Sequence, residues 1–199
     1  MDSISGRLQP AALTLLEAWS HLPRQDGVPL RASFDPLSVA RILPVISLVQ
    51  RISADEWRVR LAGTELERRW GRPLTGLNYA DVMSPQVTVI THREFETICS
   101  QPCGSWSLRH LELQSGRRLE TDTLRLPLRA SDGSISLILT SNGEIGTDLQ
   151  CRADPSQGVV TVVEQHFFDI GAGIPALNCV EAMTLEAGRI TTPAPPPYR

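Results

Sequence analysis

The chain has 199 residues, a formal net charge of −3 and a hydrophobic content of 41%. This length predicts one domain with flanking extensions. This hydrophobic content is too high for a disordered chain, so we expect disorder only at the two ends. The negative net charge argues against nucleic-acid binding, for which a basic face is typical.

The N-terminal residues lack the basic segment and apolar run of a signal peptide, and no apolar run approaches the roughly 20 residues that span a bilayer. We therefore expect a cytoplasmic protein that does not contact a membrane. Its four cysteines are expected to be reduced, because disulfides are rare in that compartment.

An amphipathic helix is predicted for the first part of the chain, residues 1–22. Hydrophobic side chains recur there at helical spacing, and Pro23 ends the pattern. The members of this stripe are Leu8, Ala12, Leu15, Leu16 and Trp19. Two interpretations stay open: the stripe covers the core of its own domain, or it forms a dimer or partner helix.

Two strands and a short helix are predicted next. The strands are Ile46–Ile52 and Trp57–Leu61, and in the second one apolar residues alternate with arginines. The helix is predicted to begin at a capping box formed by Thr64 and Glu67, and to end at Gly71.

A longer helix, Pro85–Cys99, precedes three strand-like segments, which are Ser105–Leu113, Arg118–Arg129 and Ser134–Glu144. Glycine-containing turns join these segments, as in hairpins. Pro127 predicts an edge position or a bulge in the second segment. Strands grouped around helices, without βαβ alternation, indicate the α+β class: a five-stranded antiparallel sheet with helices on one face, plus the N-terminal helix.

The chain is predicted to have four parts. Residues 158–170 are apolar but show no clear strand pattern, and the proline-rich end predicts disorder. The parts are an N-terminal helix (1–22), the main domain (23–146), a C-terminal extension (147–190) and a disordered proline-rich tail (191–199).

Two runs of residues resemble the PAS family. The run from Trp57 to Leu66 (WRVRLAGTEL) is similar to the second strand of a PAS domain and the start of its first helix, and the run from Trp70 to Gly76 (WGRPLTG) resembles the segment that follows. More narrowly, the chain resembles a family of short stand-alone bacterial PAS proteins, found mainly in alphaproteobacteria. This second resemblance rests on Trp19, Asp35-Pro36, Glu120, Leu126-Pro127-Leu128 and the run from Asp169 to Pro175.

The resemblance implies a PAS-like fold and a sensory or interaction module in bacterial signalling, which binds a small ligand or a protein partner. A homodimer or a signalling-protein partner is expected. Flavin-binding light sensors of the PAS class carry a reactive cysteine in a run that corresponds to Asn78-Tyr79-Ala80-Asp81 here. That cysteine is missing, so no flavin adduct is expected.

Metal and haem sites are not expected either. Cys99 and Cys103 have a C-x₃-C spacing, and His92 and His110 would complete four zinc ligands on paper, but proline and glycine flank Cys103 as in a simple turn. His92 is the one histidine on the long helix that would serve a haem, and it lies at the edge of the apolar arc of that helix.

Glu94 is the residue that most needs an explanation, because it lies on the apolar arc of the long helix, where an unpaired carboxylate is costly. It pairs with an arginine from the sheet, points into a polar ligand cavity, or is exposed at a shifted helix end. If Glu94 is buried, its pKa should be raised unless an arginine compensates. The predicted cavity face consists of Trp70, Ile90, Thr91, Glu94, Ile98 and Trp106.

Two alternatives to a ligand sensor remain. One is a ligand-free regulatory dimer with a filled core. The other is an enzyme that uses Glu94 with Arg109 or His110; the sequence contains no nucleophile, phosphate-loop or metalloprotease motif, so no enzyme is expected.

Overall fold

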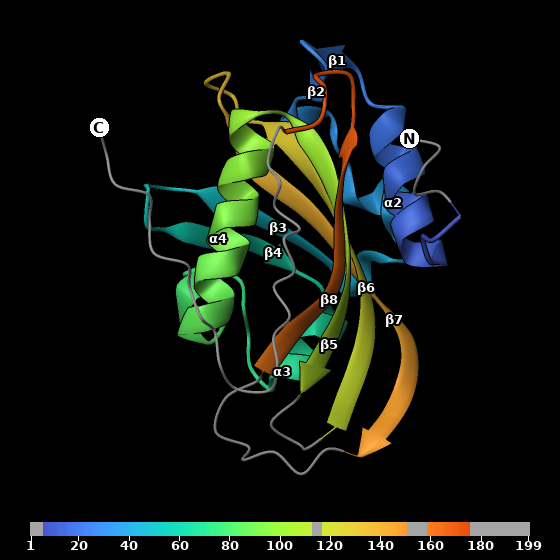
Figure 1. Cartoon of the computed structure of the whole chain (residues 1–199). Coiled ribbons are helices and arrows are strands. Elements are labelled where there is room, and N and C mark those ends of the chain that lie inside the picture. The colour runs from blue at the N-terminus through green and yellow to red at the C-terminus, as the bar shows by residue number, and fades with distance from the viewer. Residues whose placement is uncertain (1–5, 113–116, 151–158, 176–199) are drawn as a thin grey trace.

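A computed structural model describes residues 6–112, 117–150 and 159–175 of the chain (Figure 1). Its longer elements are helices and strands in the first half of the chain and strands alone in the second half. They are α2 (Pro10–Ser20), β3 (Ile46–Arg51), β4 (Trp57–Ala62), α3 (Thr64–Trp70), α4 (Pro85–Ser100), β5 (Cys103–Glu112), β6 (Arg117–Arg129), β7 (Ile135–Gln150) and β8 (Val159–Asp169).

Shorter elements connect these. They are β1 (Arg24–Gln25), β2 (Val28–Pro29) and the 3₁₀ turns η1 (Arg31–Ser33), η2 (Pro36–Val39), η3 (Leu43–Val45) and η4 (Tyr79–Asp81). Strands β1 and β2 pair only with each other as a two-stranded sheet. The proline-rich tail lies outside the described residues, so its predicted disorder stays a prediction.

In the described part of the chain, the six longer strands form one antiparallel sheet in the order β4-β3-β7-β6-β5-β8. The predicted α+β class is confirmed, but the sheet has six strands and not five. The sixth strand, β8, lies in the segment assigned to a C-terminal extension and pairs with β5 at the sheet edge. A register shift between Leu108 and Arg109 interrupts the β5–β8 ladder, and such a bulge weakens the alternation that identifies a strand in sequence.

Helices cover both faces of the sheet (Figure 1). As expected, α3 and α4 lie on one face, and α2 covers the opposite one. Alternation along β6 produces this division: Leu124, Leu126 and Leu128 point toward α2, while Thr123 and Arg125 point to the other side. The two apolar layers therefore form separate core clusters.

The N-terminal helix belongs to the core of its own domain. Its stripe of Leu8, Ala12, Leu15, Leu16 and Trp19 is only 0–8% exposed and packs with the leucines of β6 and β7. The indole Nε1 of Trp19 donates to the carbonyl of Pro127 at 2.9 Å. Each large apolar side chain buried in this way contributes about 1.5–3 kcal/mol. This corrects the interpretation of these five residues as a dimer or partner surface, because they are not available to a partner.

Asp122 of β6 holds the start of α2 in place. Its carboxylate accepts from the backbone N–H of Gln9 at 2.5 Å and from the indole Nε1 of Trp106 at 2.6 Å. Burial raises the pKa of this carboxyl, and the two hydrogen bonds partly offset that effect. Trp106 is therefore fixed on the α2 face of the sheet.

Helix α3 ends at Gly71, as predicted, with φ at 65° in the left-handed region. The predicted capping box is wrong: Gly63 is the N-cap, and the carboxylate of Glu67 accepts from the backbone N–H of Leu74 at 3.1 Å. Gly63 is required for a different reason, since a Cβ there would collide with the backbone carbonyl of Leu43.

Pro127 lies in β6, which is an interior strand of the sheet. The pairing of β6 with β5 stops at Arg125, so Pro127 lies beyond the last pair on that side. A register shift in the β6–β7 ladder follows between Leu128 and Arg129. The strand therefore accommodates a proline where one neighbour has ended. No helix in the described ranges is long and apolar enough to cross a membrane.

Candidate functional site

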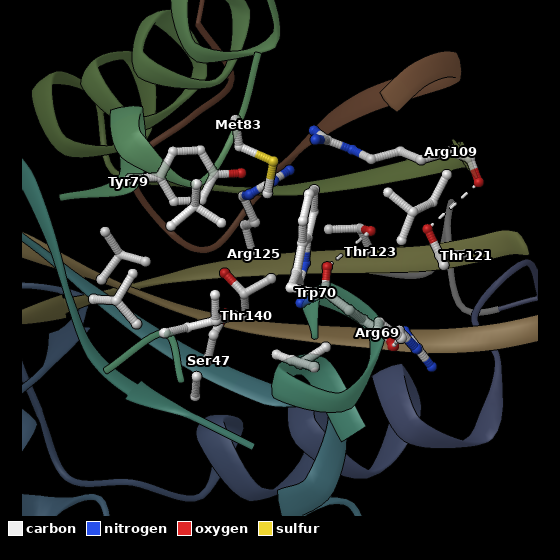
Figure 2. A pocket seen from close by; sticks show the side chains of 18 of the residues that line it. Ser47, Arg69, Trp70, Tyr79, Met83, Arg109, Thr121, Thr123, Arg125 and Thr140 are labelled. Atoms are coloured by element: carbon white, nitrogen blue, oxygen red, sulfur yellow. Dashed lines mark hydrogen bonds between the residues drawn. The ribbon is translucent and has the colours of Figure 1, made fainter. Parts of the chain in front are cut away.

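A pocket lies between the sheet and the elements that cover the face opposite to α2, namely α3, η4 and α4 (Figure 2). The volume of this cavity, counted as the space that the centre of a water molecule can occupy, is about 80 Å³. Its apolar and aromatic lining consists of Val49, Val59, Ala62, Leu66, Trp70, Leu74, Tyr79, Val82, Met83, Phe95 and Leu111. Its polar lining consists of Ser47, Arg69, Arg109, Thr121, Thr123, Arg125, Thr140 and Asn142.

The floor of the pocket is polar because the pocket-facing positions of three neighbouring strands carry polar side chains. Thr140 of β7 is the register partner of both Ser47 on β3 and Arg125 on β6. Thr123 is paired with Asn142, and its hydroxyl donates to the Asn142 side-chain oxygen at 3.3 Å. The floor thus presents hydroxyl, amide and guanidinium groups side by side, next to the apolar Val49, Val59 and Leu111 of the same sheet and opposite a largely apolar roof.

Glu94 of α4 anchors the charged end of this floor. Its carboxylate accepts from Arg109 Nη2 at 2.7 Å, from Arg125 Nη1 at 2.9 Å to each oxygen, and from the Ser105 hydroxyl at 2.7 Å. The three charged residues are all buried, at 3–4% exposed. Of the three alternatives for Glu94, the structure selects pairing with arginines from the sheet, immediately behind the pocket wall.

The charges of this cluster do not balance. Burial alone would raise the pKa of Glu94, but Arg125 and Arg109 together hold that pKa below its ordinary value. The pKa of Arg109 is lowered by burial and by repulsion from Arg125, and Glu94 only partly compensates. One carboxylate is thus shared by two buried guanidinium groups, and both arginines line the pocket.

The remaining donors of these arginines are unevenly used. Arg109 Nε donates to the Ser107 hydroxyl at 2.7 Å. The guanidinium of Arg125 lies over the ring of Phe95, 5.4 Å from its centroid, and its Nε is buried without a hydrogen-bond partner. Figure 2 shows the hydroxyl of Tyr79 directed toward the Arg125 guanidinium.

A third buried arginine, Arg69, is neutralised. Its Nε contacts Glu65 at 3.2 Å, its Nη2 contacts Glu144 at 3.5 Å, and its Nη1 donates to the Asn142 carbonyl at 3.0 Å. The neighbouring Arg68 is exposed and pairs with the same Glu65. The run of charges on α3 therefore divides into one solvated arginine and one structural arginine.

The residues predicted for the cavity face are placed in three different ways. Trp70 lines the pocket, and Glu94 lies directly behind its arginines. Thr91 and Ile98 are fully buried and Ile90 is half-buried on α4, but none of them is among the lining residues. Trp106 lies on the opposite face of the sheet, which corrects its assignment to the cavity.

The main lining residues that sequence reasoning missed are Tyr79 and the polar positions of β6. The signal was present in the sequence, since Thr121, Thr123 and Arg125 alternate with leucine and aspartate. That pattern is typical of a strand whose polar face meets something other than an apolar core.

The candidate metal and haem residues are not among the lining residues of the pocket. His92 is half-buried, and its ring centroid lies 6.4 Å from that of Trp57 and 6.4 Å from that of Tyr79. Burial lowers the pKa of His92. His110 instead contacts Glu120 at 3.1 Å. Burial raises the pKa of Cys99 and of Cys103 to about 12 in each case. In the parts of the chain that the structure describes, no three His, Cys, Asp or Glu side chains gather as a metal site.

The fold described here is an α+β domain with a mixed polar and apolar pocket between its antiparallel sheet and its shorter elements. A family model described as a PAS domain matches residues 7–141, so the chain belongs to the PAS domain family. The match includes α2 and ends within β7. Membership supports a role as a sensory or interaction module.

No curated protein matches the chain. A solved structure of an RNA-binding light-oxygen-voltage receptor is similar to it at 16% sequence identity, with a TM-score of 0.42. That similarity covers 68% of this chain and 38% of the receptor chain.

Proposed function

We propose that this PAS domain is a sensory module whose small-molecule ligand binds in the pocket between the sheet and α3, η4 and α4. The observation that carries the proposal is the polar floor, because a cavity needed only for packing would be lined by apolar side chains. The cavity volume of about 80 Å³ counts only positions of the centre of a water molecule. If a sphere of that volume is enlarged by the 1.4 Å radius of water, its volume is about 280 Å³, close to the lower end of the range of roughly 300–1,000 Å³ for ligand pockets.

The sheet offers a route for the signal. Thr123 and Arg125 contribute to the pocket, while Leu124 and Leu126 on the same strand pack against α2. A ligand that binds one arrangement of β6 more tightly than another shifts the population toward it, and the packing of α2 shifts with it. In this proposal the N-terminal helix is the output of the sensor and not its partner-binding face.

Native mass spectrometry of the freshly purified full chain tests the proposal. We expect a bound small molecule that is released on denaturation. A Thr140→Phe variant fills the pocket and should lose that mass, whereas Val89→Phe, at a position 54% exposed on α4, should keep it. A bound mass that survives in Thr140→Phe would place the ligand elsewhere. The absence of any bound mass, with no small molecule shifting the amide resonances of the pocket, would contradict the proposal.

We propose no catalytic role for Glu94. Both of its oxygens are occupied by arginine or serine donors, and its lowered pKa makes it a poor general base. His110, the other candidate, is engaged with Glu120. These contacts support a structural and electrostatic function of the cluster.

A homodimer and a cytoplasmic location stay proposals. A dimer interface would have to use surfaces other than the buried stripe of α2. A cytoplasmic location is supported by the free thiols of Cys99 and Cys103, since thiols persist in a reducing compartment.

A further inference from the structure

The wall of the pocket carries more positive than negative charge. Arg109 and Arg125 both contact the single carboxylate of Glu94, so the cluster has one positive charge more than its acids balance. Arg69, the other arginine in the lining, is matched by Glu65 and Glu144 and does not add to this excess. A buried charge without a partner is costly, and the fold accepts that cost at the pocket.

The hydrogen-bonding capacity of the cluster is also incompletely used. Two guanidinium groups carry ten N–H donors, and among the described residues their side-chain acceptors are the two oxygens of Glu94 and the hydroxyl of Ser107. Arg125 Nε is buried and has no acceptor. The hydroxyl of Tyr79, which can donate or accept, is directed toward the same guanidinium group (Figure 2). Donors thus exceed acceptors where positive charge exceeds negative charge.

We propose that the ligand of this pocket is a small organic carboxylate, whose carboxylate is bound by Arg109 and Arg125 and whose body lies against Trp70 and Leu66. The inference rests on the proposed function, because it names the ligand class of that pocket. A single carboxylate supplies one negative charge, which matches the excess, and its two oxygens fit the planar donors of a guanidinium group. A phosphate monoester carries about −1.5 to −2 charges and would leave the site negative.

Benzoate and benzamide are suitable probes, because they have nearly the same shape and differ in charge. We expect benzoate to shift the amide resonances of β6 and α3 in the full chain, with a Kd at least tenfold lower than that of benzamide. Arg109→Gln leaves a neutral Glu94–Arg125 pair, so the variant should remain folded and lose the preference for benzoate. Benzamide, which carries no charge, should lose much less affinity in this variant than benzoate does. Arg68→Gln, the same charge change at an exposed position on α3, should leave the preference intact.

The outcomes separate this inference from the proposed function. Equal binding of the two probes, or no binding of benzoate, overturns the carboxylate inference, while a co-purifying mass that Thr140→Phe removes leaves the pocket function standing. Tighter, Arg109-dependent binding of phenyl phosphate than of benzoate also overturns it in favour of a phosphorylated ligand. If Arg109→Gln does not fold, Arg125→Gln provides the same charge balance from the other side of Glu94. Retained preference for benzoate in a folded variant overturns the assignment of these arginines.

Discussion

Substitution of Glu94 by glutamine is the sharpest probe of what holds the pocket together. The change is nearly isosteric and removes the one negative charge that Arg109 and Arg125 share. Breaking a buried ion pair by removal of one partner costs about 3–5 kcal/mol, because the remaining charge stays buried. For a chain of this size, that corresponds to a fall of about 6–20 °C in Tm.

Urea unfolding of the full chain, followed by circular dichroism, measures this effect against a matched control. Glu96→Gln is the same substitution two residues further along α4, where the carboxylate is 37% exposed and pairs with Arg51 at 3.0 Å. Exposed pairs contribute at most about 1 kcal/mol, so this variant should unfold close to the wild type. A loss for Glu94→Gln no larger than that for Glu96→Gln would refute the electrostatic account of the cluster.

Arg109→Gln gives the complementary measurement. It removes a positive charge from a cluster that has one in excess, and the Glu94–Arg125 pair remains with both of its contacts at 2.9 Å. We therefore expect it to lose clearly less stability than Glu94→Gln. If the two variants are equally unstable, the cluster depends on packing around the side chains and not on the balance of charge.

Three further predictions concern pH, the N-terminal helix and one close approach of the backbone. Because the pKa of Glu94 is lowered in the fold, its stabilisation is complete above its ordinary value of 4.5 and is lost as the pH falls through the lower folded value. Urea unfolding between pH 7 and pH 3 should show a shallower acid loss in Glu94→Gln, and parallel curves would contradict this. Asp122→Ala leaves the N–H of Gln9 and an indole N–H without acceptors, at about 1–3 kcal/mol each, and hydrogen exchange in α2 should accelerate. Unchanged exchange would show that apolar packing alone holds α2. Gly63→Ala should cost about 1–3 kcal/mol in urea unfolding through overpacking, whereas Gly146→Ala, with open space around it, should be neutral; equal effects would contradict the steric argument.

Local patterns predicted most of the elements. The alternation in Trp57–Ala62, the glycine after α3 and the apolar arc of α4 each specify one element through contacts within a few residues. Strand β8 was only weakly indicated, because it lies at the sheet edge and its side chains from Thr161 to Phe167 are half-buried or exposed without a clear alternation. The period-two signal of a strand depends on one buried and one exposed face, and β8 lacks that contrast over much of its length.

The site was predictable in part. Glu94 was identified because a carboxylate on an apolar arc requires a partner, and that requirement depends on one helix alone. The identity of its partners depends on which face of the sheet each strand residue occupies. A single-residue change in that assignment moves a side chain to the other face, and this accounts for the misplacement of Trp106 on the α2 side.

The two faces of β6 have different roles in the domain, because successive side chains of a strand point to opposite faces of the sheet. On one face, leucines and Asp122 fix α2 through apolar packing and through the N–H of Gln9. On the other, Thr123 and Arg125 line a pocket where charge is left unbalanced. Because Arg125 and Asp122 lie three residues apart on one strand, the proposed function predicts that a ligand that displaces Arg125 also shifts the backbone that positions Asp122. In the proposed function the pocket therefore needs no contact with α2 to affect it, and the buried stripe of α2 is the part of the domain on which we propose that a bound ligand acts.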